Sequence, residues 1–112
     1  MVVDELLEEQ TDRVFHALAD RTRRDIVVRA LQHPGSVTEL AQAYSMSFAA
    51  VQKHVAVLER AGLVTKERRG RRQLVWANPE AIRGAAALLE QYERLWLGRT
   101  ARMTEILATD IQ

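Results

Sequence analysis

SVTELAQAYSMSFAAVQKHVAVLERAGL, residues 36–63, is the stretch that decides how this chain folds. It predicts two short helices joined by a tight turn at Ser45-Met46. Ser36 precedes the first helix as a candidate N-cap, with a glutamate three residues later at the spacing of a capping box. Ser47 opens the second helix with a hydroxyl that can accept from free amides, and Ala61-Gly62 ends it. Two short helices around a tight turn are typical of a helix-turn-helix.

A strongly cationic hairpin is predicted directly after these helices. Residues 64–69 and 72–77 have the pattern of two strands around Gly70-Arg71. The segment 66–72 holds five cations and one acid, a charge of +4, whereas the chain as a whole carries only +1. Such a run can be a solvated loop, but beside a helix-turn-helix it indicates a surface aimed at DNA. A helix-turn-helix followed by a basic hairpin is a winged helix.

Length and composition limit the possible fold classes and kinds of site. At 112 residues, 47% hydrophobic and 28% charged, the chain is predicted to be one soluble domain with its own core. The absence of cysteine removes disulfides and thiolate metal sites. No apolar run approaches the ~20 residues of a membrane span. The acidic N-terminus MVVDELLEEQ is unlike a signal peptide, so we expect a cytoplasmic protein.

Two helices are predicted ahead of the helix-turn-helix. Residues 2–18 have an amphipathic pattern that residues 10–12 could interrupt. Asp20 is predicted to cap a second helix over residues 21–32, and His33-Pro34-Gly35 breaks the chain after it. The residues of this second helix expected to face the core are Ile26, Val27, Ala30 and Leu31.

Arg23 and Arg24 fall in the first turn of that second helix, where cations oppose the helix dipole. An anion should therefore compensate them. Asp20 or Asp25 is the better candidate, and a DNA phosphate is the weaker one.

One long helix is predicted to follow the hairpin, from Pro79 almost to the C-terminus. An apolar stripe repeats along it with spacings of three and four over more than three heptads. About thirty residues would reach ~45 Å, farther than so small a domain extends. We expect the surplus stripe to be buried against a second copy, with an intramolecular core helix as the alternative, and Gly98 could kink the helix. The residues predicted to hold the dimer, taken from the first and last helices, are Leu6, Leu7, Leu89, Tyr92, Trp96, Met103 and Ile106.

The segments VFHALADRTRRDIV and VTELAQAYSMSFAAVQKHVAVLERAGLV, with the arginine-rich hairpin, resemble the ArsR family of bacterial winged-helix repressors. The likeness covers about residues 12–77. It implies a homodimer held by the first and last helices that binds an operator of dyad symmetry and blocks transcription. The chain departs from the family pattern at Arg21, where a proline is common, and at Gln52, where a serine is frequent. It also lacks the cysteines with which many members sense metals or metalloids.

Groove geometry selects the candidate base contacts. The major groove admits one helix and displays a distinct donor and acceptor pattern for each base pair, and the helix from Ser47 would enter it N-terminus first. Gln52 is the best candidate for base reading, since an amide can bond adenine bidentately. Phe48 or Ala49 could touch a thymine methyl, and Lys53 could reach a guanine or a phosphate.

Phosphate contacts are expected on either side of that helix. Thr38 and Ser47 are candidate anchors. The hairpin arginines should contact phosphates or enter the minor groove, although strand alternation prevents all four from reaching: Arg68, Arg69, Arg71 and Arg72. Two copies would read half-sites ~34–36 Å apart.

The remaining chemistry-bearing residues predict no enzyme, no bound metal and no cofactor. The three histidines form no pair at helical spacing, and we interpret His54 as a DNA-backbone contact or a packing residue. No activated nucleophile and no glycine-rich phosphate loop is recognisable. Trp76, Tyr92 and Trp96 could line a small-molecule pocket, but aromatic residues at helical spacing are more often core or interface.

The predicted architecture is therefore mainly α with a small β-hairpin, in the order α-α-α-α-β-β-α. We expect residues 1–112 to form a single winged-helix DNA-binding domain with dimerisation helices at both ends. The predicted function is a dimeric, sequence-specific transcriptional regulator, a repressor on double-stranded DNA, with no membrane partner. The alternative is a winged helix whose hairpin binds an acidic protein, but the exposed start of the second helix is too polar to favour it.

Overall fold

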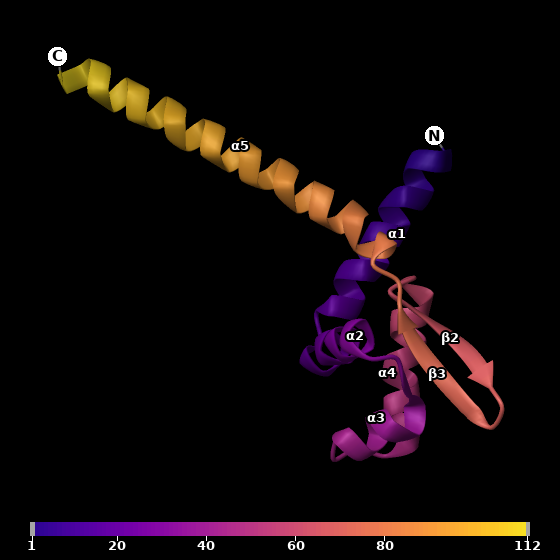
Figure 1. Cartoon of the computed structure of the whole chain (residues 1–112). Coiled ribbons are helices and arrows are strands. Elements are labelled where there is room, and N and C mark those ends of the chain that lie inside the picture. The colour runs from indigo at the N-terminus through magenta and orange to yellow at the C-terminus, as the bar shows by residue number, and fades with distance from the viewer. Residues whose placement is uncertain (1, 112) are drawn as a thin grey trace.

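Within residues 2–111, which the computed structural model describes, five helices and a small sheet follow one another along the chain (Figure 1). The side chains of residues 2–4, 6, 100 and 109–111 lie outside this description. The elements are α1 (Val2–Leu18), α2 (Arg21–Gln32), β1 (Gly35–Ser36), α3 (Val37–Ala43), α4 (Phe48–Arg60), β2 (Val64–Arg69), β3 (Arg72–Ala77) and α5 (Glu80–Ile111). The helix-turn-helix and the two hairpin strands have the predicted bounds to within a residue.

The first helix is continuous, so the interruption considered at residues 10–12 is wrong. The Thr11 hydroxyl donates to the Leu7 carbonyl, 2.9 Å away, and so satisfies its polar group within the helix. Asp20 caps α2 as predicted, because its carboxylate accepts from the Arg23 amide at 2.9 Å. Leu31 was expected inside, but it lies at the edge of the apolar stripe of α2 and is 52% exposed.

The two arginines at the start of α2 have a structural role: Asp20 attracts the charge of Arg23, as predicted, but the hydrogen bonds of both guanidinium groups go to carbonyls of α1. Arg23 Nε donates to the Ala17 carbonyl at 2.7 Å, and its terminal nitrogen donates to the His16 carbonyl at 3.1 Å. Arg24 donates to the Leu18 carbonyl at 2.7 Å. These carbonyls belong to the last turn of α1, at the negative end of its dipole, and the His16 carbonyl also accepts from the Ala19 amide. The α1–α2 corner is thereby held together by side-chain caps.

The helix-turn-helix begins and ends with the predicted caps. Ser36 accepts from the Glu39 amide, and Ser47 accepts from the Ala50 amide, both at 3.1 Å. At the far end of α4, Gly62 takes the positive φ of 76° that a side chain would strain. The Leu63 amide then donates to the Leu58 carbonyl at 3.0 Å, as in a Schellman motif.

The sheet has three strands in the order β1-β3-β2, all antiparallel. The predicted element order lacked β1, which pairs Gly35 with Val75 and Ser36 with Leu74. A strand of two residues is too short to leave a periodic pattern. Its effect is to attach the start of α3 directly to the hairpin.

One hydrophobic core joins these elements. Side chains from α1, α2, α4 and both hairpin strands are almost completely buried in it, among them Val14, Ile26, Val51, Val55, Leu58, Leu63, Val64 and Val75. The helix-turn-helix and the hairpin therefore share one core and hold a fixed relation to each other.

α5 extends far beyond that core (Figure 1). It begins at Glu80, directly after Pro79, and continues through Gly98 without interruption. Ala85 is still buried, but from Leu89 onward every described side chain of α5 is exposed. The principal extents of 72 × 36 × 20 Å and the radius of gyration of 19.6 Å follow from this shape, since a compact chain of this length has a radius of ~13 Å. We call residues 2–88 the body and residues 89–111 the arm.

Across the described residues, no helix combines the length and apolar character that crossing a membrane requires.

Candidate nucleic-acid interface

The N-terminal half of α4 presents the predicted base-reading side chains to solvent. Ser47, Phe48, Ala49, Gln52 and Lys53 are all exposed. The opposite side of the same helix is buried through Val51, Val55 and Leu58, as predicted. The helix is thus fixed by its apolar face while its polar face remains free.

His54 lies between these two faces and is half-buried. Its Nδ1 is 3.3 Å from a terminal nitrogen of Arg23 and 3.9 Å from the carboxylate of Asp20. This arrangement fits the packing alternative, because the ring is turned toward the α1–α2 corner. The Arg23 amide that donates to Asp20 also holds the pKa of that carboxyl below its usual value.

A groove runs between the helix-turn-helix and the hairpin. It is lined from the helix side by Thr38 and Phe48 and from the hairpin side by Arg68, Arg71 and Arg72. The structure therefore brings five of the predicted contact residues from separate elements to one surface.

Sequence reasoning did not single out two polar residues of this groove, Gln42 and Gln73. Gln42 follows Thr38 by four residues, so helical spacing places it on the same face of α3, and this signal could have found it. Gln73 sits opposite Arg68 in the hairpin register, which only the strand pairing reveals.

The arginines of the hairpin differ in their surroundings. Arg69 Nε donates to the Glu67 carboxylate at 3.1 Å, and its guanidinium lies 6.0 Å from the centre of the Trp76 ring. Arg72 donates to the carboxylate of Glu39, which comes from α3. Arg68 and Arg71 have no acidic partner among the side chains that the structure describes.

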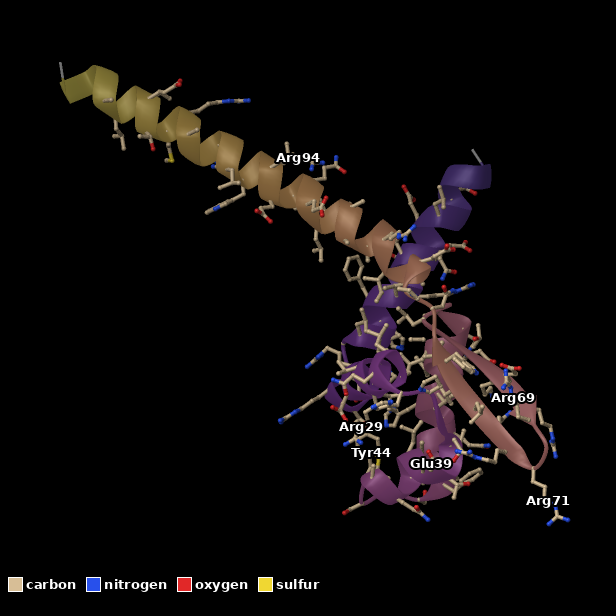
Figure 2. The ribbon with its side chains drawn as sticks, in the orientation of Figure 1. Arg29, Glu39, Tyr44, Arg69, Arg71 and Arg94 are labelled. Carbon is tan, nitrogen blue, oxygen red and sulfur yellow. The ribbon has the colours of Figure 1, made fainter. Side chains whose placement is uncertain are left out.

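Figure 2 shows Arg71 at the tip of the hairpin, directed away from the body. Gly70 forms the tip with a φ of 62° and nothing within 4 Å of the position a Cβ would take. A glycine at the first position of a two-residue turn matches the twist of the two strands. The tip is therefore narrow, cationic and open on all sides.

One ion pair and one hydrogen bond position the elements behind this surface. Lys66 of β2 lies 3.4 Å from the carboxylate of Glu59 on α4. The Tyr44 hydroxyl donates to Asp25, and burial together with this bond raises the pKa of Tyr44 to about 12. The bonds from Tyr44 and Arg29 lower the pKa of Asp25. These contacts join α2 to α3 and α4 to β2.

The aromatic residues considered for a small-molecule pocket do not converge. Trp76 lies on β3, and its Nε1 is buried without a hydrogen-bond partner. Tyr92 lies in the groove between α1 and α5, about 18 Å along α5 from Glu80 at 1.5 Å per residue. Trp96 is one turn farther along the arm. Among the described residues, no group of three or more His, Asp or Glu side chains is arranged to hold a metal ion.

Comparisons with known proteins agree on one family. No protein-family model matches the chain. The chain is 41% identical over 85 residues to the HTH-type transcriptional regulator Rv2034 of Mycobacterium tuberculosis, a match that spans 76% of this chain and 77% of that protein.

Solved structures similar to this chain are also transcriptional regulators. A crystal structure of an ArsR family transcriptional regulator superposes with a TM-score of 0.74 at 32% identity, covering 80% of this chain and 92% of that one. The homodimeric winged helix-turn-helix DNA-binding domain of Mb0332 from Mycobacterium bovis superposes with a TM-score of 0.65 at 27% identity, covering 80% and 83%.

Proposed function

Because the chain belongs to the ArsR family of winged helix-turn-helix transcriptional regulators, we propose that it works as a homodimeric repressor that binds an operator of dyad symmetry. One observation carries this proposal. The exposed start of α4 and the open cationic tip of the hairpin flank one groove on a body whose core holds both in place.

In the proposed complex, α4 enters the major groove with its first two turns. Gln52 reads adenine through its amide, and Phe48 or Ala49 contacts a thymine methyl. Lys53 reaches a guanine or a phosphate from the following position. These residues carry the sequence preference.

Phosphate contacts come from the edges of the same surface. Thr38 and Ser47 bond the backbone beside α4. On the hairpin, the contacts come first from Arg68 and Arg71, because Arg69 and Arg72 are already bonded to acids. These contacts give affinity and salt dependence without choosing a sequence. His54 supports α4 from behind.

The arm and α1 form the proposed dimer interface. Large apolar side chains are exposed here: Leu7, Leu89, Tyr92, Trp96, Met103 and Ile106. The predicted contact of Leu6 concerns a side chain outside the described residues. An apolar surface of this extent is expected to meet a partner, and the Mb0332 domain is homodimeric. In this proposal residues 1–112 are one functional unit, a DNA-reading body with a pairing arm.

Pairing two copies places two α4 helices on one face of the duplex. Half-sites of a dyad operator are then separated by about one helical turn, ~34–36 Å. Occupation of such a site within a promoter excludes the transcription machinery, and this exclusion is the proposed mode of repression.

The test compares two variants on two duplexes. The first duplex is the one that the wild-type protein selects from a random library, and the second has a scrambled sequence. Gln52→Ala should relax the base preference by ~1–3 kcal/mol at the position it reads. Arg71→Ala should weaken binding to both duplexes about equally and reduce the salt slope by ~1.8, because the dimer loses one phosphate contact in each subunit.

Arg83→Ala is the control, because Arg83 is exposed on α5 away from the groove. It should bind both duplexes like the wild type. If Gln52→Ala and Arg71→Ala lowered both affinities by the same factor, the proposed division between reading and anchoring would be wrong. If the wild-type protein bound no duplex at low salt, the proposed function would be refuted.

A further inference from the structure

Glu39 stands out on the proposed DNA surface because it is an acid among cations. It lies on α3, lines the same groove as Arg68 and Arg71, and more than half of its side-chain surface is exposed. A carboxylate at such a position repels phosphate. Its presence there calls for a reason other than simple attraction to DNA.

The capping box does not supply that reason. The Glu39 amide already donates to the hydroxyl of Ser36, the N-cap of α3, at 3.1 Å. In a complete capping box the glutamate side chain would turn back to the N-cap amide. Here one carboxylate oxygen of Glu39 accepts instead from Arg72 on β3.

The same carboxylate also packs onto β1. Its second oxygen would lie 3.3 Å from a Cβ built on Gly35. Since β1 pairs with β3, the glutamate of α3 meets the sheet at two strands. Glu39 therefore bridges the helix-turn-helix and the hairpin.

We propose that Glu39 is a positioning residue that determines DNA selectivity. It holds Arg72 away from the phosphates and fixes the hairpin relative to α3. The inference rests on the proposed function and adds a restraint to it. At a correct half-site, Arg68 and Arg71 reach the backbone without disturbing the Glu39–Arg72 pair. At random DNA, the duplex cannot recruit Arg72 to compensate for a poor fit.

The hairpin contains a matched comparison, the pair Glu67–Arg69. It has the same residue types, similar exposure and a nitrogen–oxygen distance of 3.1 Å. Both of its members belong to β2, so it bridges no two elements. Arg69 also lies over the Trp76 ring and keeps that contact when Glu67 is changed.

The salt dependence of binding gives the measurement. Each phosphate neutralised by a cation adds about 0.9 to the slope of log affinity against log salt. If Glu39→Gln releases Arg72 to one phosphate in each subunit, the slope of the dimer on random duplex should steepen by about 1.8. At 0.1 M salt, counterion release corresponds to an affinity gain of about 8-fold for each contact and about 60-fold for the two contacts of the dimer.

The experiment measures binding of the full-length dimer to the selected duplex and to a scrambled duplex. The salt concentration is varied from about 0.05 to about 0.3 M, a range that includes physiological ionic strength. The proteins are the wild type, Glu39→Gln, Glu67→Gln, Arg72→Gln and the Glu39→Gln/Arg72→Gln double variant. Far-ultraviolet circular dichroism verifies that each variant keeps its helices. Both glutamate variants change the net charge equally, so charge alone cannot separate them.

Glu39→Gln should bind the scrambled duplex about 60-fold more tightly at 0.1 M salt and should lose most of that factor in the ratio of selected to scrambled affinity. Glu67→Gln should leave this ratio unchanged within about 2-fold. Arg72→Gln should keep the wild-type slope, and the double variant should lose the gain of Glu39→Gln.

Two results would overturn the inference. One is a flatter slope for Arg72→Gln alone, since Arg72 would then already contact phosphate. The other is identical behaviour of Glu39→Gln and Glu67→Gln. Both leave the proposed function intact, because that function fails only if the wild-type protein ignores both duplexes.

Discussion

The body and the arm carry the same kind of apolar pattern and have opposite surroundings. In the body, Val51, Val55 and Leu58 of α4 follow helical spacing and are at most 1% exposed. In the arm, Leu89, Trp96 and Met103 lie on one helix face at intervals of seven residues and are 54–67% exposed. The two regions differ in what the chain places around them.

The difference shows that periodicity predicts a face to be buried and does not specify the neighbour that buries it. Around α4 the chain supplies α1, α2 and the hairpin. The arm instead extends away from the rest of the chain, and its described side chains are all exposed (Figure 1). A second copy is the neighbour we propose for the arm.

The largest effect is expected from shortening a leucine in the body. Leu58→Ala should lower the free energy of unfolding by about 3 kcal/mol, because the side chain is completely buried and leaves a cavity. Leu97→Ala is the matched change in the arm, at a residue off the apolar stripe, and should stay within about 0.5 kcal/mol. Urea unfolding followed by circular dichroism measures both. Equal losses would abolish the contrast between body and arm.

A charge on the stripe of the arm should separate the dimer and spare the body. Met103→Asp places a carboxylate in the proposed interface, and we expect at least a 100-fold weaker association, about 2.7 kcal/mol. Sedimentation velocity at micromolar concentration should show the variant as a single chain. Circular dichroism should show that its helicity per residue is that of the wild type. Leu97→Asp, off the stripe, should remain paired. If Met103→Asp also remained paired, the arm would not be the interface.

Two glycine substitutions should have opposite signs in the two regions. Gly62→Ala forces a side chain into a positive φ, with its Cβ 3.0 Å from Gln10 Nε2, and should destabilise by about 1–2 kcal/mol. Gly98→Ala meets nothing within 4 Å in the arm and should stabilise that helix by about 1 kcal/mol. Thermal unfolding of the two variants side by side tests the pair. A stabilising Gly62→Ala would contradict the described helix end.

The smallest effect concerns acid. The Arg23 amide lowers the pKa of Asp20 in the folded protein, so this cap stabilises the fold above the unfolded pKa of ~3.9 and is lost as pH falls through the folded value. Asp20→Ala should therefore cost about 1 kcal/mol at pH 7. Its stability should converge with that of the wild type below about pH 3. Glu90→Ala in the arm removes no cap and should show no such convergence. Denaturant midpoints at pH 7, 4 and 3 provide the measurement.

Sequence patterns among neighbouring residues predicted the helix caps and the hairpin of the body well. Ser36, Asp20 and Ser47 each precede an apolar helical pattern, and the structure shows each accepting from the amide three residues on. The hairpin followed from Gly70-Arg71 between two β-type runs. Such features lie within a few residues of one another, so sequence displays them directly.

What sequence did not predict depends on contacts between distant residues. β1 exists because β3 lies beside it, and Glu39 turns to Arg72 although its spacing suggests a complete capping box. Arg23 and Arg24 bond carbonyls of α1 rather than nearby acids. Leu31 continues the apolar pattern but lies beyond the reach of the core. The contact residues of the interface remain predictions, which only DNA can test.

The root of α5 has one more consequence. A rigid rod of 32 residues is ~48 Å long, and only its first few turns are seated in the body. Such a rod is a lever: a tilt of about 5° at its root sweeps its far end by ~4 Å. Conversely, if the far ends of α5 in two copies are held against each other, the orientation of each body is restricted more tightly than a contact near the start of α5 would restrict it.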